Sequence, residues 1–300
     1  MKFVVTGGAG FIGSYIVRYL VDNGYQVIVV DNLFRGKLKN LSGYENKIDF
    51  HNLDILNFEE LRTVVKDSEG IFHQAALTSV SESFTQTDKY QEVNVNGTEN
   101  IFKLGKEFGI KIVFASSSSI YGKPRSIPIK ENASRNPINP YGRTKLEDEI
   151  LAEQYSKLGV KIIGLRYFNV YGIGQTNDYA GVITKFQQAI DANNPPIIFG
   201  DGTQVRDFIY VEDVVKANLL AMQSNTDSAF LNIGTGIATS INDLANLMIK
   251  LSRKSLVSIH SNLPEGDVKE SQADIHLAKQ LINWMFETNL TDGLKKSFYN

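Results

Sequence analysis

Tyr141 and Lys145 stand four residues apart at the start of a segment with helical spacing, so both side chains project from one face of a helix. A phenol is a weak base near neutral pH because its ordinary pKa is about 10. An ammonium group one helical turn away stabilises the phenolate and lowers that pKa toward the working range. The pair could therefore take a proton from a substrate hydroxyl group.

A run of four serines, residues 116–119, follows an apolar strand expected over residues 111–115. In an open α/β sheet the chemistry lies at the carboxyl ends of the strands, so one of these hydroxyl groups could share the proton path with Tyr141. The serines could also form a polar turn, and one Tyr–Lys pair can arise by chance among 13 tyrosines. The order of the motifs, with a glycine-rich turn first, favours the catalytic interpretation.

The glycine-rich turn holds Gly7, Gly10 and Gly13 between an apolar strand, residues 2–6, and a segment with helical spacing. Such a turn lets backbone N–H groups approach a diphosphate at the positive end of a helix. Gly7 would form the tight turn, Gly10 the close approach and Gly13 the close helix packing. Glycines also gather in ordinary turns, but the strand before and the helix after favour a dinucleotide site.

Asp31 follows a second apolar strand, residues 26–30. A carboxylate about 20 residues beyond the turn suits a ribose diol and repels a 2′-phosphate, so NAD is the predicted cofactor. Arg35 lies close enough in sequence to leave NADP open. Asp54 and Ile55 follow a third strand, residues 48–52; they could contact adenine, or equally serve as a helix N-cap and a core residue.

Strands and helices alternate through the first half of the chain, which predicts an α/β fold with a doubly wound parallel Rossmann sheet. After residue 167 we expect a polar, turn-rich segment, a helix at 182–192 and an extended piece at 195–199, then a strand at 206–211, a helix at 213–223 and a last buried strand at 229–233. Beyond residue 235 the pattern predicts shorter helices and one strand, at 256–260. We therefore expect a cofactor domain made of residues 1–167 and about 206–235. A smaller, discontinuous α/β substrate domain would take residues about 168–205 and 236–300.

Composition excludes several classes of protein. A net charge of −2 and a pI of about 6.1 give no general attraction to nucleic acid or to an anionic membrane. No apolar run approaches membrane-spanning length and the chain begins in a strand, so we expect a cytoplasmic protein. With zero cysteines there are no disulfides or thiolate sites, and no metal is expected because the four histidines lack ligand spacing: His51, His73, His260 and His276.

Taken in order, the motifs resemble those of the extended short-chain dehydrogenases/reductases that act on nucleotide sugars, in particular the UDP-glucose (UDP-galactose) 4-epimerases. The resemblance covers nearly the whole chain and lies on residues 6–14, 31–32, 54–55, 73–76, 94–98, 116–122, 141–145, 166–172, 200–213 and 266–267. It implies NAD, a UDP-sugar substrate and a homodimer. The dimer would form through helices 90–108 and 141–158, where Phe102, Leu146 and Ile150 are either interface or core residues.

The resemblance also implies roles for single residues. Ser117 matches the catalytic serine or threonine, Tyr141 the base, and Lys145 its partner, which also holds the nicotinamide ribose. The implied cofactor contacts, with Tyr141 and Lys145, are Gly7, Gly10, Phe11, Ile12, Gly13, Asp31, Asn32, Asp54, Ile55, Gln74, Ala75, Ala76 and Asn94. The implied substrate contacts are Ser117, Tyr141, Asn169, Arg206, Asp267 and Ser271. Without the resemblance, Asn94, Asn169 and Arg206 would be ordinary polar residues.

Two serines help to choose among reactions. Related 4,6-dehydratases carry Asp-Glu directly after the catalytic residue and related decarboxylases carry a Glu, whereas this chain has Ser118 and Ser119. Neither serine supplies an extra acid or base, which predicts epimerisation of UDP-glucose and UDP-galactose at carbon 4. A UDP-glucuronate 4-epimerase, or another nucleotide-sugar epimerase or dehydratase, stays open. A non-catalytic dinucleotide-sensing protein is disfavoured because Ser117, Tyr141 and Lys145 are all present.

The chain departs from the resembling epimerases at two positions. Pro264 stands where they usually place an arginine on the diphosphate, so Arg206 or Lys269 would have to replace it. Ser271 stands where enzymes confined to unsubstituted hexoses carry a bulky tyrosine. A small residue leaves space beside the substituent at carbon 2, so N-acetylated UDP-sugars are expected to be accepted as well.

Overall fold

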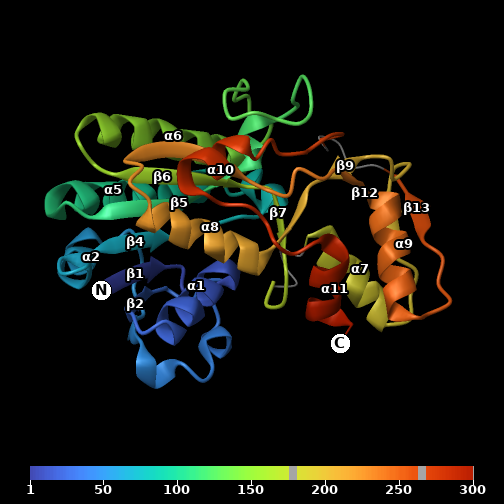
Figure 1. Ribbon diagram of the computed structural model, residues 1–300, viewed down its shortest axis with the longest axis horizontal. Helices are drawn as coiled ribbons and strands as arrows, with labels where there is room; N and C mark the ends of the chain where they lie inside the picture. The colour runs from blue at the N-terminus through green and yellow to red at the C-terminus, as the bar shows by residue number, and fades with distance from the viewer. Residues whose placement is uncertain (176–180, 263–267, 300) are drawn as a thin grey trace.

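The computed structural model describes residues 1–175, 181–262 and 268–299, and its centre is a parallel sheet of seven strands (Figure 1). The strands lie in the order β11-β6-β5-β4-β1-β2-β3, and every paired neighbour is parallel. Their bounds are β1 Lys2–Thr6, β2 Gln26–Val30, β3 Asp49–His51, β4 Gly70–His73, β5 Lys111–Ser117, β6 Ile162–Tyr167 and β11 Ser228–Ile233.

Helices cover both faces of this sheet because successive side chains of a strand point to opposite faces. In β1, Phe3 and Val5 pack into one core and Val4 into the other. The first core includes α1 (Phe11–Asp22), α8 (Val211–Gln223) and α10 (His276–Ile282). The second includes α2 (Phe58–Val65), α5 (Gly97–Phe108) and α6 (Pro140–Lys157), and Figure 1 shows α5 and α6 opposite α1 and α8. This arrangement confirms the predicted doubly wound fold.

The strand order reverses between β1 and β4. From β1 the chain runs outward through β2 and β3, and from β4 it runs the other way through β5, β6 and β11. In open α/β sheets ligands bind at such a switch point, beyond the carboxyl ends of the strands. The glycine-rich turn follows β1 and Gln74 follows β4, so both predicted cofactor segments meet at this point.

A smaller group of elements lies beside the sheet, on the right in Figure 1. It contains the helices α7 (Val182–Asp191), α9 (Ile241–Ser252) and α11 (Leu290–Phe298), which share a third apolar core. Its strands form three pairs: β7 (Asn169–Tyr171) with β10 (Phe208–Tyr210), β9 (Val205–Arg206) with β12 (Thr239–Ser240), and β8 (Ile197–Phe199) with β13 (Ile259–Ser261). Each pair joins residues that lie far apart in sequence.

Several expected elements differ in detail. The strand expected at 206–211 is two strands, β9 and β10, because the buried Asp207 between them turns its carboxylate to Thr235, Gly236 and Ala273. The helix expected at 90–108 contains a π-helical segment, η3, before α5. The remaining short elements are η1 Leu38–Leu41, η2 Glu45–Lys47, α3 Val80–Ser83, α4 Thr87–Tyr90, η3 Gln91–Asn96 and η4 Ser118–Tyr121.

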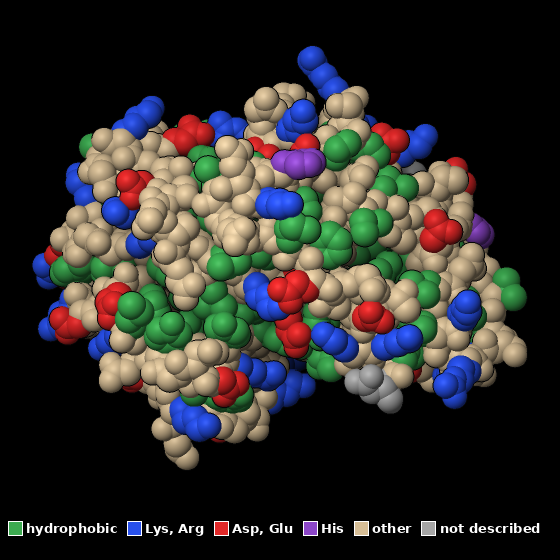
Figure 2. All heavy atoms as spheres, in the orientation of Figure 1, with side chains coloured by type: hydrophobic (Ala, Val, Ile, Leu, Met, Phe, Trp, Pro, Cys, Tyr) green, Lys and Arg blue, Asp and Glu red, His purple; other side chains and the backbone are tan. Residues whose placement is uncertain are grey.

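The structure also bears on surface charge, membrane-spanning helices and metal sites. On the face drawn in Figure 2, acidic and basic side chains are interspersed. None of the helices in the described ranges is long and apolar enough to span a membrane. Within the same ranges no group of three His, Asp or Glu side chains is arranged to hold a metal ion.

Candidate active site

The glycine-rich turn packs too tightly for side chains. Gly7 has a φ of +68°, and a Cβ atom on it would lie 2.7 Å from the Ala75 backbone nitrogen. A Cβ atom on Gly13 would lie 2.2 Å from the Gly7 carbonyl oxygen. Gly10 begins α1 without a side-chain cap, so no side chain takes up the first N–H groups of the helix. These features fit a diphosphate held by backbone N–H groups.

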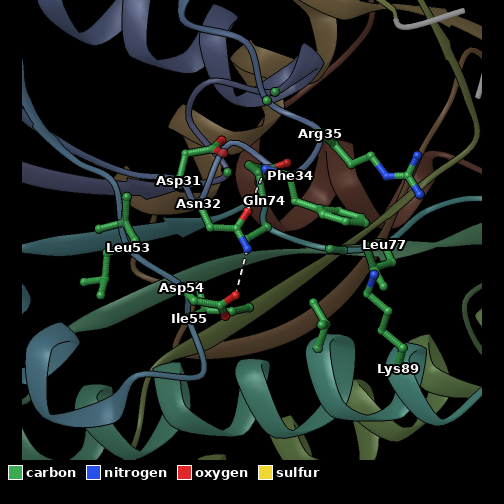
Figure 3. A pocket seen from close by; sticks show the side chains of 17 residues that line it. Asp31, Asn32, Phe34, Arg35, Leu53, Asp54, Ile55, Gln74, Leu77 and Lys89 are labelled. Carbon is green, nitrogen blue, oxygen red and sulfur yellow. Dashed lines mark hydrogen bonds between the residues drawn. The ribbon is translucent and has the colours of Figure 1, made fainter. Parts of the chain in front are cut away.

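A cavity of about 200 Å³ opens beside this turn (Figure 3). Nine of its lining residues are predicted cofactor contacts: Gly7, Gly10, Asp31, Asn32, Asp54, Ile55, Gln74, Ala75 and Ala76. Asp31 accepts hydrogen bonds from the backbone N–H groups of Ala9, at 3.0 Å, and Leu33, at 2.8 Å. Burial raises the pKa of its carboxyl group above the ordinary value. The Asp31 carboxylate is therefore hydrogen-bonded directly to the glycine-rich turn.

Asp54 lines this cavity and does not cap a helix. Its carboxylate accepts a hydrogen bond of 2.7 Å from the Asn32 side-chain amide, drawn as a dashed line in Figure 3. The N-cap of α2 is Asn57, whose side chain accepts from the Glu60 N–H group. The alternative of an N-cap at Asp54 is therefore wrong. The polar pair Asn32–Asp54 and the apolar Ile55 form one wall, which suits the polar edge and flat face of adenine.

A second cavity, of about 290 Å³, continues the first across the turn. The two share Gly7, Gly10, Arg35, Gln74 and Ala76, so they form one groove. The second cavity brings together predicted residues from four separate segments: Phe11, Ile12, Gly13, Gln74, Ala76, Ser117, Tyr141 and Lys145. The glycine-rich turn and the pair Tyr141–Lys145 therefore line one continuous groove.

The start of α6 places Tyr141 in this groove. Pro140 occupies the first turn, where a missing N–H group costs nothing, and Asn139 caps the helix by accepting from Gly142 N–H at 2.7 Å. A Cβ atom on Gly142 would lie 2.8 Å from the Ser119 carbonyl oxygen. The helix start therefore packs directly on η4, and this contact holds Tyr141 beside the end of β5.

Lys145 lies one turn further along and is only 2% exposed. Its Nζ atom is 3.0 Å from the Asp148 Oδ2 atom. Burial lowers the pKa of Lys145, but the charges of Asp148 and Tyr141 outweigh this and raise it above the ordinary value. The ammonium group is thus charged at neutral pH. It faces the groove as a fixed cation, which is what a phenolate at Tyr141 needs.

Ser117 ends β5 and is 8% exposed. Its hydroxyl oxygen accepts from the Ser119 N–H group at 3.1 Å and its hydroxyl donates to the Ser119 hydroxyl at the same distance. The hydroxyl group is therefore oriented by η4 at the groove wall. A phenol, a cation and a hydroxyl beside a dinucleotide cradle define an enzyme of the dinucleotide-dependent class, suited to oxidise or reduce an alcohol.

Comparisons with known proteins identify the family. The model of the NAD dependent epimerase/dehydratase family matches residues 3–234. The chain is 41% identical over 298 residues to a protein of Methanocaldococcus jannaschii, named provisionally as a UDP-glucose 4-epimerase, with 98% of this chain and 96% of that protein covered. The chain therefore belongs to the NAD-dependent epimerase/dehydratase family. This confirms the predicted resemblance, an enzyme, and NAD as the cofactor.

Two solved structures are similar over almost the whole chain. The UDP-glucose 4-epimerase of Thermotoga maritima with UDP-glucose has a TM-score of 0.95 at 36% identity, with 99% of this chain and 97% of that chain covered. The UDP-N-acetylglucosamine 4-epimerase of Methanobrevibacter ruminantium, in complex with UDP-N-acetylmuramic acid, has a TM-score of 0.94 at 34% identity, with 99% and 96% covered. Both support the Rossmann fold found here.

Asn94 does not line either cavity. It is completely buried in η3, and its side-chain amide bonds the N–H and C=O groups of Leu77 at 2.8 and 3.0 Å. The same amide donates to the Thr144 hydroxyl at 3.0 Å. Asn94 therefore ties the segment after β4 to α6, and its cofactor contact stays a prediction.

Three predicted substrate residues also lie outside the two cavities. The Asn169 side chain donates to the Asp207 carbonyl oxygen at 3.0 Å. Arg206 and Ser271 are neighbours, since Ser271 N–H donates to the Val205 carbonyl oxygen at 3.2 Å. The Lys269 carbonyl oxygen accepts a hydrogen bond of 3.0 Å from the Val205 N–H group. Pro264 and Asp267 lie outside the described residues.

The groove contains further residues to which the sequence analysis assigned no role. Among them are Phe34, Gly36, Leu53, Leu77, Lys89 and Val93 at one end and Thr78, Tyr167, Phe168, Val170 and Gln175 at the other. Phe34 lies between two cations, with Lys89 at 3.9 Å and Arg35 at 4.8 Å from its ring centre (Figure 3). Phe168 directly follows β6, and Thr78 lies in the segment after β4. A position beyond the end of a strand is a signal that the sequence offers. Lys89 and Val93 come from α4 and η3, and no spacing pointed to them.

Proposed function

We propose that the chain is a UDP-hexose 4-epimerase that interconverts UDP-glucose and UDP-galactose and also accepts N-acetylated UDP-sugars. One observation carries the proposal: Ser117, Tyr141 and Lys145 line the same groove as the glycine-rich turn. Membership of the family supports the reaction class. The names of the similar proteins support a UDP-sugar.

The cofactor end of the groove assigns roles to the chain's own residues. Gly7, Gly10 and Gly13 would hold the diphosphate of NAD, and Asp31 the adenosine ribose. Asn32, Asp54 and Ile55, with residues 74–76, would enclose the adenosine, because all of them line the cavity at this end. When bound, NAD supplies a reversible hydride acceptor beside the sugar.

The proton is handled by Tyr141. As the phenolate it takes the proton of the 4-hydroxyl group, while the ammonium group of Lys145 keeps the phenolate stable. The Ser117 hydroxyl bonds the same sugar oxygen and shares the proton path. Tyr141 returns the proton after the 4-keto sugar has turned about its diphosphate link and presented its other face. Such a site must hold the nucleotide firmly and the sugar loosely.

The wall beside Ser117 supports epimerisation over elimination. Ser118 and Ser119 occupy the positions where dehydratases and decarboxylases carry acids, and Ser119 uses its hydroxyl and N–H groups to hold Ser117. Neither hydroxyl can act as a second acid near neutral pH. Oxidation and re-reduction at one carbon therefore remain as the chemistry of the site.

The nucleotide and sugar contacts would come from the smaller group of elements. The Ser271 N–H group donates to the carbonyl oxygen of Val205, the residue before Arg206, so a cation for the diphosphate and a small residue beside the sugar would occur close together. Asn169 would complete this side, with Asp267 in the role that the resemblance implies. The small Ser271 is the reason for including N-acetylated sugars.

The proposal also covers the oligomeric state, the location in the cell and the division into domains. A cytoplasmic homodimer would form through α5 and α6, with the chain divided into cofactor and substrate domains as predicted from the sequence. Ile150 is 40% exposed and could contribute to such an interface. Phe102 is completely buried in the core and would not. Leu146 packs partly buried beside Ile120 and Phe168.

The deciding experiment offers the purified protein four nucleotide sugars: UDP-glucose, UDP-N-acetylglucosamine, UDP-glucuronate and dTDP-glucose. NMR of the products identifies the reaction and the sugar at once. UDP-galactose formed from UDP-glucose supports the proposal. Turnover of UDP-glucuronate alone would replace it by a UDP-glucuronate 4-epimerase, a loss of water would indicate a dehydratase, and no turnover of any sugar would contradict it.

A further inference from the structure

Asp148 is a buried carboxylate that the proton transfer described above does not use. It lies on α6, three residues beyond Lys145, and is 0% exposed. Its Oδ2 atom pairs with the Lys145 Nζ atom at 3.0 Å, whereas its Oδ1 atom is buried without a hydrogen-bond partner among the described residues. A buried ion pair with an unsatisfied oxygen contributes little to stability, so packing gives no reason for it.

The position of Asp148 on the helix points to the proton-transfer site. Tyr141, Lys145 and Asp148 stand at positions i, i+4 and i+7, which share one face of a helix. The ammonium group of Lys145 attracts a phenolate at Tyr141. A carboxylate on the same ammonium group repels that phenolate and weakens the attraction. Asp148 is therefore placed to adjust the electrostatic potential at Tyr141 through Lys145.

Other charged or titratable groups near this pair have partners of their own. On α6, Glu149 is held by Arg166 at 2.8 Å, and Glu147 accepts from the Gln91 side chain. From β4, the His73 ring bonds Thr6 and Thr98, and burial together with Lys145 lowers its pKa to about 3, so it is neutral. Among the described residues, Asp148 is the carboxylate paired with Lys145.

We propose that Asp148 is a positioning residue, which holds the ammonium group of Lys145 and offsets its charge, and so sets the pH range in which Tyr141 exchanges its proton. An ammonium group has three N–H donors, so Asp148 can take one and leave two for the groove. The inference rests on the proposed function, because that function gives Tyr141 and Lys145 their roles.

The test replaces Asp148 by Asn, which keeps an oxygen on the ammonium group but removes the charge. The phenolate absorbance of Tyr141 is titrated without substrate, as the difference between each protein and the same protein carrying Tyr141→Phe. Loss of the carboxylate charge makes the electrostatic potential at Tyr141 more positive. The midpoint of the Tyr141 titration should therefore move to lower pH by about one unit. The acidic limb of the kcat profile should move in the same direction.

Two variants serve as controls. Glu147→Gln removes the charge of the neighbouring carboxylate on the same helix and should leave the midpoint unchanged within about 0.3 units. Asp148→Glu keeps the charge and should stay close to the original protein. Should Asp148→Asn not fold, Asp148→Ser removes the same charge with less bulk and must give the same shift.

An unchanged Tyr141 midpoint in the neutral variants would overturn the inference, and so would an equal shift in Glu147→Gln. A purely structural role would lower stability without moving the midpoint. The titration needs no substrate, so it decides the role of Asp148 even if no UDP-sugar is turned over. A failure to turn over any UDP-sugar would overturn the proposed function instead.

Discussion

The proton chemistry proposed for the groove depends on the hydroxyl group of Tyr141. Its neighbours supply the cation and the helix start. Tyr167 is a second phenol in the groove wall, but its hydroxyl is held by Gln74 and Asn218, and burial raises its pKa. Gln74 and Ala76 line the same groove and carry no acid or base. Removal of this oxygen should therefore affect catalysis far more than cofactor binding.

Tyr141→Phe should lower kcat about 10²- to 10⁴-fold, the usual contribution of a positioned general base. Bound NAD should remain, because the glycine-rich turn and Asp31 are unchanged. Turnover is followed by NMR and bound NAD by absorbance after denaturation. Tyr155→Phe is the matched control on the same helix, since its hydroxyl bonds Glu99 away from the groove, and it should keep nearly full turnover. Full activity in Tyr141→Phe would end the assignment.

Ser271→Tyr tests the substrate range. The added ring should fill the space proposed for the N-acetyl group and lower kcat/KM for UDP-N-acetylglucosamine at least about tenfold relative to UDP-glucose. Ser271→Ala, which adds no bulk, should keep the ratio of the two. The measurement is the ratio of kcat/KM values on the two sugars. A loss of equal size on both would count against the pocket interpretation.

Single residues were predictable where spacing alone determines their place. Tyr141 and Lys145 share the groove because positions i and i+4 share a helix face. The pattern also placed the serine run 116–119 after a strand at the same sheet edge, and the resemblance then selected Ser117 from this run. The internal hydrogen bonds of Asn94 were not predictable in this way. Its amide is used up by Leu77 and Thr144, and such internal hydrogen bonds leave no trace in the spacing of a sequence.

At the level of elements, the contact between α6 and η4 decides how Tyr141 and Ser117 face each other. The close approach depends on Gly142, because any side chain there meets the Ser119 carbonyl oxygen. η4 in turn carries the hydrogen bonds that orient Ser117. A shift of the helix start would therefore separate the phenol from the serine hydroxyl.

Gly142→Ala should lower kcat about tenfold to a hundredfold, because a displacement of about 1 Å is costly in an aligned site. The overpacked contact should also reduce the free energy of unfolding by about 1–3 kcal/mol. Turnover and urea denaturation measure the two effects. Arg143→Ala, at the exposed next position of the same helix, is the control and should change neither by much. Unchanged kcat in Gly142→Ala would contradict the role of the contact.

Elements with a clear apolar run were predicted well, as for the strands expected at residues 2–6 and 26–30, which are β1 and β2. The short strands were not, because β7 has three residues and β9 two, too few to show a period. Their pairing depends on partners elsewhere in the chain, such as β10 for β7. The π-helical segment η3 was also missed, since its sequence is compatible with a regular helix.

At the scale of the whole molecule, the buried imidazole of His73 couples stability to pH. Its pKa is lowered from 6.5 to about 3 by burial and by Lys145. The unfolded chain therefore binds a proton at a higher pH than the folded protein does. The stability contributed by the neutral ring is complete above pH 6.5 and is lost as the pH falls toward 3.

His73→Gln should reveal this coupling. The difference in unfolding free energy between the original protein and the variant should shrink by about 1.4 kcal/mol per pH unit below pH 6.5, because only the original protein gains a proton at this position on unfolding. Urea denaturation between pH 7 and 5 measures it, and taking the difference removes the opposite contribution of Asp148, whose pKa burial raises to about 6. His276→Gln, on an exposed side chain, should not reproduce the trend. A constant difference for His73→Gln would contradict the account.

The order of the strands has a consequence for synthesis on the ribosome. Six of the seven strands of the central sheet lie within the first 167 residues, and only the edge strand β11 comes later. In the proposed function the sugar side would use Arg206 and Ser271, which are separated by more than sixty residues of sequence. A growing chain thus holds nearly everything required for the nucleotide cradle long before the opposite wall has been translated.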